Sequence, residues 1–203
     1  MNMITFETLK AYFDNIPEGL KRPDWTRTQV GIFVPSPLTE INFALEQLLE
    51  SRAINSSELF FDAGFGDGRI LLLTAGVHGI PSAGAEYDEG LVGFAEHHIK
   101  EIERLYIAGG KVLPITLARG YFGEDKTYSR AGIRFKDIAT FYNYKDNQLQ
   151  IAEKIVRQSS RGTRFLYRGG PYPMIFEGLK FEQSIEYVDP SGHRSNVLHV
   201  YRK

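Results

Sequence analysis

Apolar and amphipathic segments alternate along the middle of the chain, and this alternation predicts strands and helices in turn. Short, mostly apolar runs predict five strands, within residues 59–64, 82–87, 112–122, 133–144 and 163–169. Apolar positions at helical spacing predict helices between them, at residues 68–79, 89–109 and 147–162. Such alternation is typical of a mainly parallel sheet covered by helices on both faces, so the expected fold class is α/β.

The two ends of the chain differ from this middle part. Residues 5–15 predict a short helix, and a second helix follows FVPSP, with Ser36 as its N-cap and Pro37 in the first helical position. FEQSIEYV and NVLHVYRK flank a DPSGH turn, a pattern that predicts an antiparallel hairpin at the sheet edge. The polar residues 123–134 predict a loop.

The composition is that of an ordinary globular protein. A length of 203 residues suits one domain, and 42% hydrophobic with 24% charged residues is enough for a proper core. The sequence holds no cysteine, which excludes disulfides and thiolate metal sites and fits a reducing compartment. No apolar run approaches the roughly 20 residues of a membrane span, and the N-terminus lacks a secretory signal pattern. We therefore expect a cytoplasmic protein without a membrane partner.

Charge is unevenly distributed, although the net charge is only −1. Residues 1–99 carry 6 Lys or Arg against 14 Asp or Glu, whereas residues 100–168 carry 14 against 7. A basic segment can follow a phosphate backbone, but such residues also lie commonly on solvent-facing helices, and we favour that interpretation. No nucleic acid partner is expected. The five histidines form no chelating i, i+4 pair, so no metal site is expected either.

The stretch LFFDAGFGDGR, residues 59–69, places three glycines directly after the first predicted strand of the parallel series. Ligands of open α/β sheets bind beyond the carboxyl ends of strands, and Gly64, Gly66 and Gly68 would let a ligand approach the backbone there. Glu86 ends the next strand, where a carboxylate can accept hydrogen bonds from both hydroxyls of a ribose. These features favour a nucleoside-containing cofactor over a tight turn with an ordinary surface glutamate.

The segment DAGFGDG resembles motif I of the class I S-adenosylmethionine-dependent methyltransferases, and EY at 86–87 resembles their ribose-binding acid. The order of predicted elements from about residue 36 onward also matches that family. The resemblance implies a three-layer Rossmann-like fold with a mainly parallel seven-strand sheet and an antiparallel C-terminal hairpin. Nicotinamide and flavin binders usually show G-x-G-x-x-G instead, so an oxidoreductase is disfavoured. FVPSP, DAGFGDGRI and GAEYDEGLV are most similar to small protein-lysine methyltransferases whose loop reads GSGDGR.

The resemblance divides the chain into a methyltransferase domain, residues 36–203, and an N-terminal extension with a short helix, residues 1–35. A lid over the site is one role for this extension. Pro35 and Thr39 would border the entrance for the methyl acceptor. Trp25 belongs either to the lid or, by preference, to the packing of the protein.

The resemblance also implies that the cofactor is S-adenosylmethionine. The cofactor-binding residues carried over from the family's motifs are Asp62, Gly64, Gly66, Asp67, Gly68, Glu86, Tyr87 and Tyr121. Asp62 would lie near the amino group of the cofactor, and Tyr87 would flank the adenine. Tyr121 stands where many members have an acid, so stacking would replace a hydrogen bond at that point. Arg69 completes the GDGR pattern or else lies on the helix surface.

Tyr142, Asn143 and Tyr144, at the end of the fourth strand of the parallel series, are the candidate catalytic residues. Their oxygens and ring faces suit an amine or a sulfonium, while ordinary strand alternation, with one tyrosine in the core, is an equal alternative. FYNYKDN lacks the N-P-P-Y motif of DNA adenine and glutamine methyltransferases, so neither substrate is expected. We expect methyl transfer to a protein side chain, with lysine ahead of a small-molecule amine or hydroxyl. The alternative is a nucleoside-cofactor-binding module without turnover, and the sequence leaves the oligomeric state open.

Overall fold

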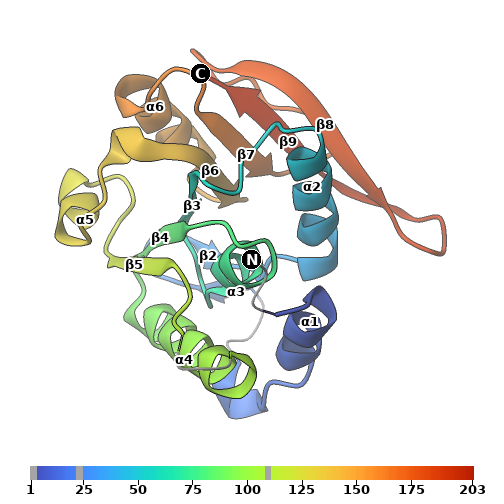
Figure 1. Cartoon of the computed structure of the whole chain (residues 1–203). Coiled ribbons are helices and arrows are strands. Elements are labelled where there is room, and N and C mark those ends of the chain that lie inside the picture. The colour runs from blue at the N-terminus through green and yellow to red at the C-terminus, as the bar shows by residue number, and fades with distance from the viewer. Residues whose placement is uncertain (1–3, 22–24, 108–110) are drawn as a thin grey trace.

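A seven-stranded sheet forms the centre of the computed structural model, which describes residues 4–21, 25–107 and 111–203 (Figure 1). The strand order is β5-β4-β3-β6-β7-β9-β8. The strands are β3 (Leu59–Ala63), β4 (Ser82–Glu86), β5 (Ile115–Arg119), β6 (Ile138–Tyr144), β7 (Arg164–Arg168), β8 (Lys180–Val188) and β9 (Arg194–Arg202). Neighbours from β5 to β7 pair in parallel, and β9 pairs antiparallel with both β7 and β8. The mainly parallel α/β sheet with an antiparallel C-terminal hairpin is therefore confirmed.

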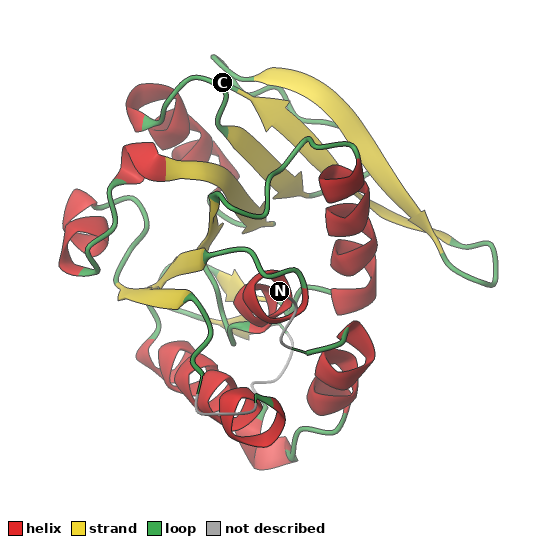
Figure 2. Cartoon of the chain, viewed as in Figure 1, coloured by secondary structure: helices red, strands yellow, loops and turns green. Residues whose placement is uncertain are grey.

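Helices cover both faces of this sheet and complete three layers (Figure 2). The helices are α1 (Phe6–Asp14), α2 (Leu38–Glu50), α3 (Arg69–Leu72), α4 (Glu89–Tyr106), α5 (Asp125–Arg130) and α6 (Gln148–Gln158). A π-helical turn (Leu73–Val77) extends α3, and short 3₁₀ turns occur at Glu18–Leu20 and Phe135–Asp137. Apolar residues of α1 to α4 share one core cluster with the sheet, and those of α5 and α6 share another.

The central strands carry large apolar residues on both faces, because both faces are covered. Phe60 of β3 and Tyr142 of β6 are buried beneath α1 and α2, whereas the next-door Phe61 and Phe141 are buried beneath α5 and α6. Each strand therefore contributes to two cores, and near-continuous apolar runs were the correct signal for these strands.

The segment 123–134 differs from its predicted loop, because it contains α5. This helix has only six residues, too few for helical periodicity to appear in the sequence. Its Tyr128 is buried and donates a hydrogen bond to the carbonyl of Phe122 at 2.7 Å. Lys154 of α6, almost fully buried, forms an ion pair with Asp125 and donates to the carbonyl of Gly123 at 3.2 Å. Long-range contacts thus stabilise α5, which the local sequence does not predict.

The start of α2 is displaced by one residue from the prediction. Pro37 is the N-cap, and no side chain caps the helix. Instead, the Oγ of Ser36 lies 2.9 Å from the hydroxyl oxygen of Tyr142. This tertiary hydrogen bond replaces the predicted capping bond. The predicted helix at 89–109 ends at Tyr106 as α4, and its last two predicted positions, 108 and 109, lie outside the described residues.

The N-terminal extension contains more than the predicted short helix. Leu9 and Phe13 of α1 are buried in the same core cluster as α2, so this helix packs as part of the main body. A small antiparallel hairpin of β1 (Thr26–Arg27) and β2 (Ile32–Phe33) follows, with two residues in each strand. Positions 1–3 and 22–24 of the extension lie outside the described residues. Within the described parts of the chain, the helices are too short or too polar to cross a membrane.

Candidate functional site

The glycine loop after β3 lies beneath the N-terminal hairpin. Gly66 has a φ of 56°, and a Cβ at this position would lie 2.6 Å from the ring of Phe33, so a larger residue would collide with β2. Gly68 has a φ of 81°, and its Cβ would lie 2.9 Å from the Cβ of Ala95 in α4. Gly68 therefore allows α3 and α4 to approach each other. A Cβ on Gly64 would meet no atom within 4 Å, which leaves free space above the loop.

Glu86, at the end of β4, joins the glycine loop to the following turn. Its Oε2 accepts a hydrogen bond from the backbone N–H of Gly66 at 3.0 Å. Its Oε1 accepts from the N–H groups of Tyr87 at 2.8 Å and Asp88 at 2.9 Å. Burial raises the pKa of Glu86, against the opposing effect of these three donors. The acid at the strand end predicted Glu86 as a cofactor-binding residue. The structure places Glu86 in the pocket wall, and its bonds to the loop were not predicted.

Asp62, at the end of β3, is a buried carboxyl group with 3% of its surface exposed. Burial raises its pKa well above the usual value, and the neighbouring carboxylates of Glu86 and Asp67 raise it further. Its side chain accepts no hydrogen bond from the described residues. A buried carboxylate without a donor is costly, so a ligand that brings a positive charge or N–H donors to Asp62 would be stabilised.

Asp67 and Arg69 form an ion pair within the loop. The Nε of Arg69 donates to both carboxylate oxygens of Asp67 at 3.0 Å, and the nearest oxygen lies 2.6 Å from a terminal nitrogen. The guanidinium carbon also lies 4.9 Å from the ring centroid of Phe13 in α1. Arg69 is therefore fixed at the pocket wall, which excludes the alternative of a free helix-surface residue.

Tyr142, Asn143 and Tyr144 all line the same pocket, on the side of β6. Asn143 donates from Nδ2 to the carbonyl of Ala63 at 2.9 Å, and its buried Oδ1 has no hydrogen bond partner. Tyr142 stacks on Phe60 in the core and reaches Ser36 with its hydroxyl, whose pKa is raised by burial.

Tyr144 lies two residues after Tyr142 and shares its face of the sheet, which disagrees with the alternative of one tyrosine in the core and one at the surface. Its ring contacts two cations. The Nζ of Lys145 lies 5.3 Å from the ring centroid, and the guanidinium carbon of Arg168 lies 4.8 Å away. Asn143 therefore has a buried hydrogen-bonding atom, Oδ1, that no described residue uses.

The far side of the pocket is aromatic and apolar. Tyr87 is 43% exposed at its edge, and Leu91 of α4 closes the wall beside it. Tyr121 and Phe122 follow β5, with ring centroids 4.6 Å apart. The hydroxyl of Tyr121 donates to the side chain of Gln150 in α6, which holds the ring at the pocket. Flat rings around an otherwise apolar cleft suit a planar heteroaromatic group.

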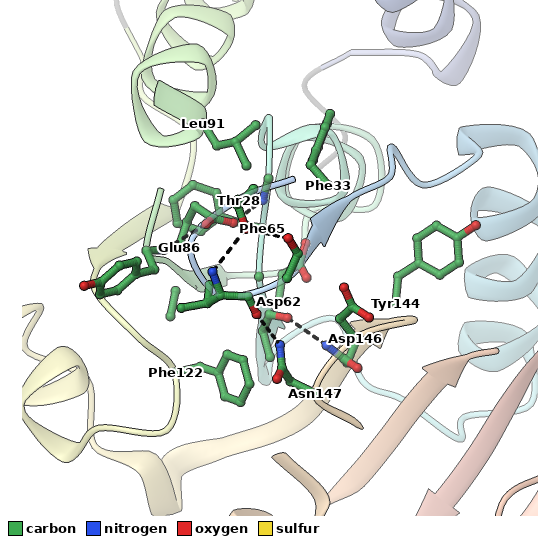
Figure 3. A pocket seen from close by; sticks show the side chains of 18 of the residues that line it. Thr28, Phe33, Asp62, Phe65, Glu86, Leu91, Phe122, Tyr144, Asp146 and Asn147 are labelled. Atoms are coloured by element: carbon green, nitrogen blue, oxygen red, sulfur yellow. Dashed lines mark hydrogen bonds between the residues drawn. The ribbon is translucent and has the colours of Figure 1, made fainter. Parts of the chain in front are cut away.

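These walls enclose about 750 Å³ of empty space, part of which is open to solvent (Figure 3). The predicted cofactor residues line it except Gly68, and Pro35 lines it whereas Trp25 and Thr39 do not. The lining residues that sequence reasoning missed include Thr28, Phe33, Phe65, Leu91, Phe122, Asp146 and Asn147. For Phe65 and Phe122 the adjacent glycine loop and Tyr121 were a usable signal. The others lie near predicted residues in the sequence, but at positions to which the motifs assign no role.

Metal-binding clusters are absent from the described residues, where no three His, Cys, Asp or Glu side chains gather around one point. His98 has a structural environment instead. It is buried between α1 and α4, accepts or donates a hydrogen bond with Tyr12 at 2.9 Å, and has its pKa lowered to about 4 by burial.

Known proteins resemble this chain in their fold but do not match it by sequence. The chain matches no protein-family model and no curated protein by sequence. It is similar to the structure of an RNA methyltransferase from Salinibacter ruber in complex with S-adenosyl-L-homocysteine, at 20% identity and a TM-score of 0.54, covering 83% of this chain and 93% of that one. An rRNA methylase from Streptococcus thermophilus matches at 14% identity and a TM-score of 0.54, over 81% and 96%.

A third similar structure comes from a study of the conversion of a disulfide bond into a thioacetal group during echinomycin biosynthesis. Identity is 16% and the TM-score is 0.57, and the match covers 98% of this chain and 93% of that chain. The fold is a Rossmann-like methyltransferase fold. In this methyltransferase fold the pocket described above occupies the carboxyl edge of the parallel strands, where β3 and its two neighbours β4 and β6 end.

Proposed function

We propose that the chain is an S-adenosylmethionine-dependent methyltransferase that acts on an amine of a protein side chain such as lysine. One observation carries the cofactor part of this proposal. The glycine loop, the buried Asp62 and Glu86 at the end of β4 line one pocket whose walls otherwise hold aromatic and apolar groups. A nucleoside linked to a charged amino acid requires this combination of an apolar cleft and carboxylates.

The unused groups of the pocket fit that cofactor. Free space above Gly64 allows a ligand to approach the backbone. Asp62 accepts no hydrogen bond from the described residues and suits an ammonium group. Both carboxylate oxygens of Glu86 accept hydrogen bonds from backbone N–H groups. Because a carboxylate oxygen can accept more than one hydrogen bond, ribose hydroxyls can donate to the same oxygens. Tyr87 and Tyr121 suit the two faces or edges of adenine.

S-adenosylmethionine supplies an electrophilic methyl group on a sulfonium, so the protein mainly has to align and desolvate the acceptor. The Nδ2 of Asn143 donates to the carbonyl of Ala63, which leaves its Oδ1 without a partner among the described residues. This Oδ1 can accept a hydrogen bond from an N–H of the acceptor amine. Tyr142 and Ser36 form a hydroxyl pair beside this position, and Tyr144 borders it. A lysine ammonium must also lose a proton before attack, and a pocket carboxyl group or water can take it.

The charge of the pocket supports a cationic acceptor. Among the described residues that line it, four carry a carboxyl group, Asp62, Asp67, Glu86 and Asp146, and one carries a guanidinium that is already paired, Arg69. An acidic pocket attracts an amine and repels a polyanion, so it favours an amine over the RNA named for two of the similar structures. The choice of a protein-borne amine rests on the resemblance of the glycine loop and FVPSP to small protein-lysine methyltransferases.

Calorimetric titration with S-adenosylhomocysteine, with NAD as the parallel control, tests the cofactor. We expect micromolar binding of the first and none of the second, whereas binding of NAD alone would contradict the proposal. Radiolabelled S-adenosylmethionine with a protein extract then tests the acceptor. We expect label on lysine that survives ribonuclease. Label only in small molecules would identify a small-molecule methyltransferase, and cofactor binding without any transfer would identify a binding module.

A further inference from the structure

Residues 26–36, called the strap below, cross one side of the pocket. The strap contains β1 and β2, which pair over only two residues each. Thr28 donates its N–H to the carbonyl of Gly31 at 2.8 Å and so closes the turn between them. A hairpin of this size is not stable by itself in water. The position of the strap therefore depends on its contacts with the rest of the protein.

Two of these contacts come from the loop directly after β6. The carboxylate Oδ2 of Asp146 accepts a hydrogen bond from the N–H of Ile32 at 2.7 Å. The Nδ2 of Asn147 donates to the carbonyl of Val30 at 2.9 Å. Both bonds use backbone groups of the strap. Together with the ring of Phe33 on Gly66, they hold the strap against the pocket.

The backbone of this loop is bent in a way that presents both side chains to the strap. Lys145 and Asn147 have φ values of 63° and 60°, a left-handed conformation that residues other than glycine adopt at a free-energy cost. The strap is fitted closely to the loop in return. A Cβ at Gly31 would lie 2.8 Å from Oδ2 of Asp146, so only glycine passes there without a shift. Fit on both sides marks a specific contact.

We propose that Asp146 and Asn147 form a latch that holds the strap closed, so that the cofactor enters and leaves only when this latch opens. The inference rests on the proposed function, because it regulates the same pocket. Thr28 and residues Val30 to Ser36 of the strap line the pocket, so opening the strap removes a wall. Asp146 and Asn147 are positioning residues in this role, since they act through the strap. The latch also follows the catalytic segment of β6 directly.

Asn147→Gly is the decisive variant. Glycine keeps the positive φ and deletes the hydrogen bond to the strap, and the side chain of Asn147 does not cap α6. Binding of S-adenosylhomocysteine is followed by stopped-flow fluorescence of Trp25, the single tryptophan, whose ring centroid lies 4.1 Å from Nζ of Lys145. We expect association and dissociation both to accelerate about five- to 30-fold, since a more populated open state speeds both.

Arg52→Gly is the matched control. Arg52 also has a positive φ, at 57°, and lies just after α2, away from the strap. This exchange repeats the backbone effect of Asn147→Gly without a change at the latch, so wild-type rates are expected. Asp146→Ala should accelerate both rates as Asn147→Gly does, and Asp146→Asn should restore most of the wild-type behaviour because an amide oxygen still accepts the N–H of Ile32.

Trypsin cleavage after the exposed Arg27 of the strap gives a second readout that needs no cofactor. Faster cleavage at Arg27 is expected in Asn147→Gly and not in Arg52→Gly. Wild-type binding rates in Asn147→Gly, or faster dissociation with unchanged association, would overturn the latch, the latter because it indicates direct contact with the ligand. Failure of the wild-type protein to bind S-adenosylhomocysteine would refute the proposed function, and wild-type cleavage at Arg27 in Asn147→Gly would refute the latch separately.

Discussion

At the scale of single residues, Asp62 combines deep burial with the absence of a hydrogen bond donor among the described residues. The raised pKa of Asp62 means that the folded state binds a proton more tightly than the unfolded state does. This stability is present below the ordinary value of 3.8 and is lost as pH rises through the raised folded value. The ionised form of Asp62 therefore opposes folding, and a cationic ligand beside it would offset this cost.

Asp62→Asn should accordingly stabilise the ligand-free protein at neutral pH and lower its affinity for the cofactor. We expect the free energy of unfolding to rise by about 1–3 kcal/mol, the range for a buried group without a partner, and the gain to shrink as pH falls toward 3.8. Urea denaturation at two pH values measures it. The exposed Asp137→Asn, which only breaks an ion pair with Arg134, should change stability by less than about 1 kcal/mol. A destabilised Asp62→Asn would contradict this interpretation of the site.

Glu86 is better tested by glutamine than by alanine. Alanine would release the N–H of Gly66 and disturb the glycine loop, whereas glutamine keeps one acceptor oxygen and the side-chain shape. Glu86→Gln should lose about 1.5–3 kcal/mol of binding free energy for S-adenosylhomocysteine, the range of charged hydrogen bonds. Calorimetry measures the loss, and circular dichroism confirms the fold. Glu89→Gln at the exposed start of α4 is the control, and equal affinities of the two variants would remove Glu86 from the site.

The glycine loop and Glu86 were predictable because each lies at the end of an apolar run, where topology alone delivers it to the carboxyl edge of the sheet. Phe33 and Asp146 were not predictable in the same way. Phe33 and Asp146 are 113 positions apart, and their sequence neighbours do not show that both line one pocket. Their proximity depends on where the small hairpin of β1 and β2 packs. Gly68 is the opposite case. It was predicted to bind the ligand because of its place in the motif, whereas in the structure it allows α3 and α4 to pack closely.

At the scale of elements, the sequence predicted those whose burial follows a regular period. The central strands carry apolar runs, and α4 has an apolar stripe over 18 residues. The elements that were missed are short and depend on distant partners. α5 is held by the buried Lys154, and Ser36 gives up its predicted capping role for a hydrogen bond to Tyr142. Tertiary contacts outweighed local preference in both cases.

Lys154→Met tests how far α5 depends on α6. The ammonium group of Lys154 lies 5.2 Å from the ring centroid of Tyr128 and 3.2 Å from the carbonyl of Gly123. Removing it should lower the free energy of unfolding by about 1–3 kcal/mol, because a charged hydrogen bond to the carbonyl of Gly123 and the ion pair with Asp125 are lost. Lys126→Met, on α5 itself but in an exposed ion pair, should cost less than about 1 kcal/mol. Chemical denaturation compares the two, and equal effects would show that α5 is independent of α6.

At the scale of the whole molecule, ligand binding and folding are linked because the pocket is assembled from β3, β4 and β6, the loop after β5 and the strap. S-adenosylhomocysteine at 100 times its dissociation constant should add about 2.7 kcal/mol to the stability of the folded state. For a chain of this size, that corresponds to a rise in melting temperature of about 5–11 °C. Differential scanning fluorimetry detects it, with NAD as the control. Equal shifts with both compounds would point to nonspecific binding.

The position of β9 has a consequence for how the protein is made. This strand is translated after β8 yet lies between β7 and β8, so it pairs with both along their lengths (Figure 1). Until residues 194–202 leave the ribosome, the backbone edge of β7 is unpaired and can pair with other nascent chains. A ribosome paused before these residues would hold a chain with an open sheet edge, and chaperone binding should peak at that stage of synthesis.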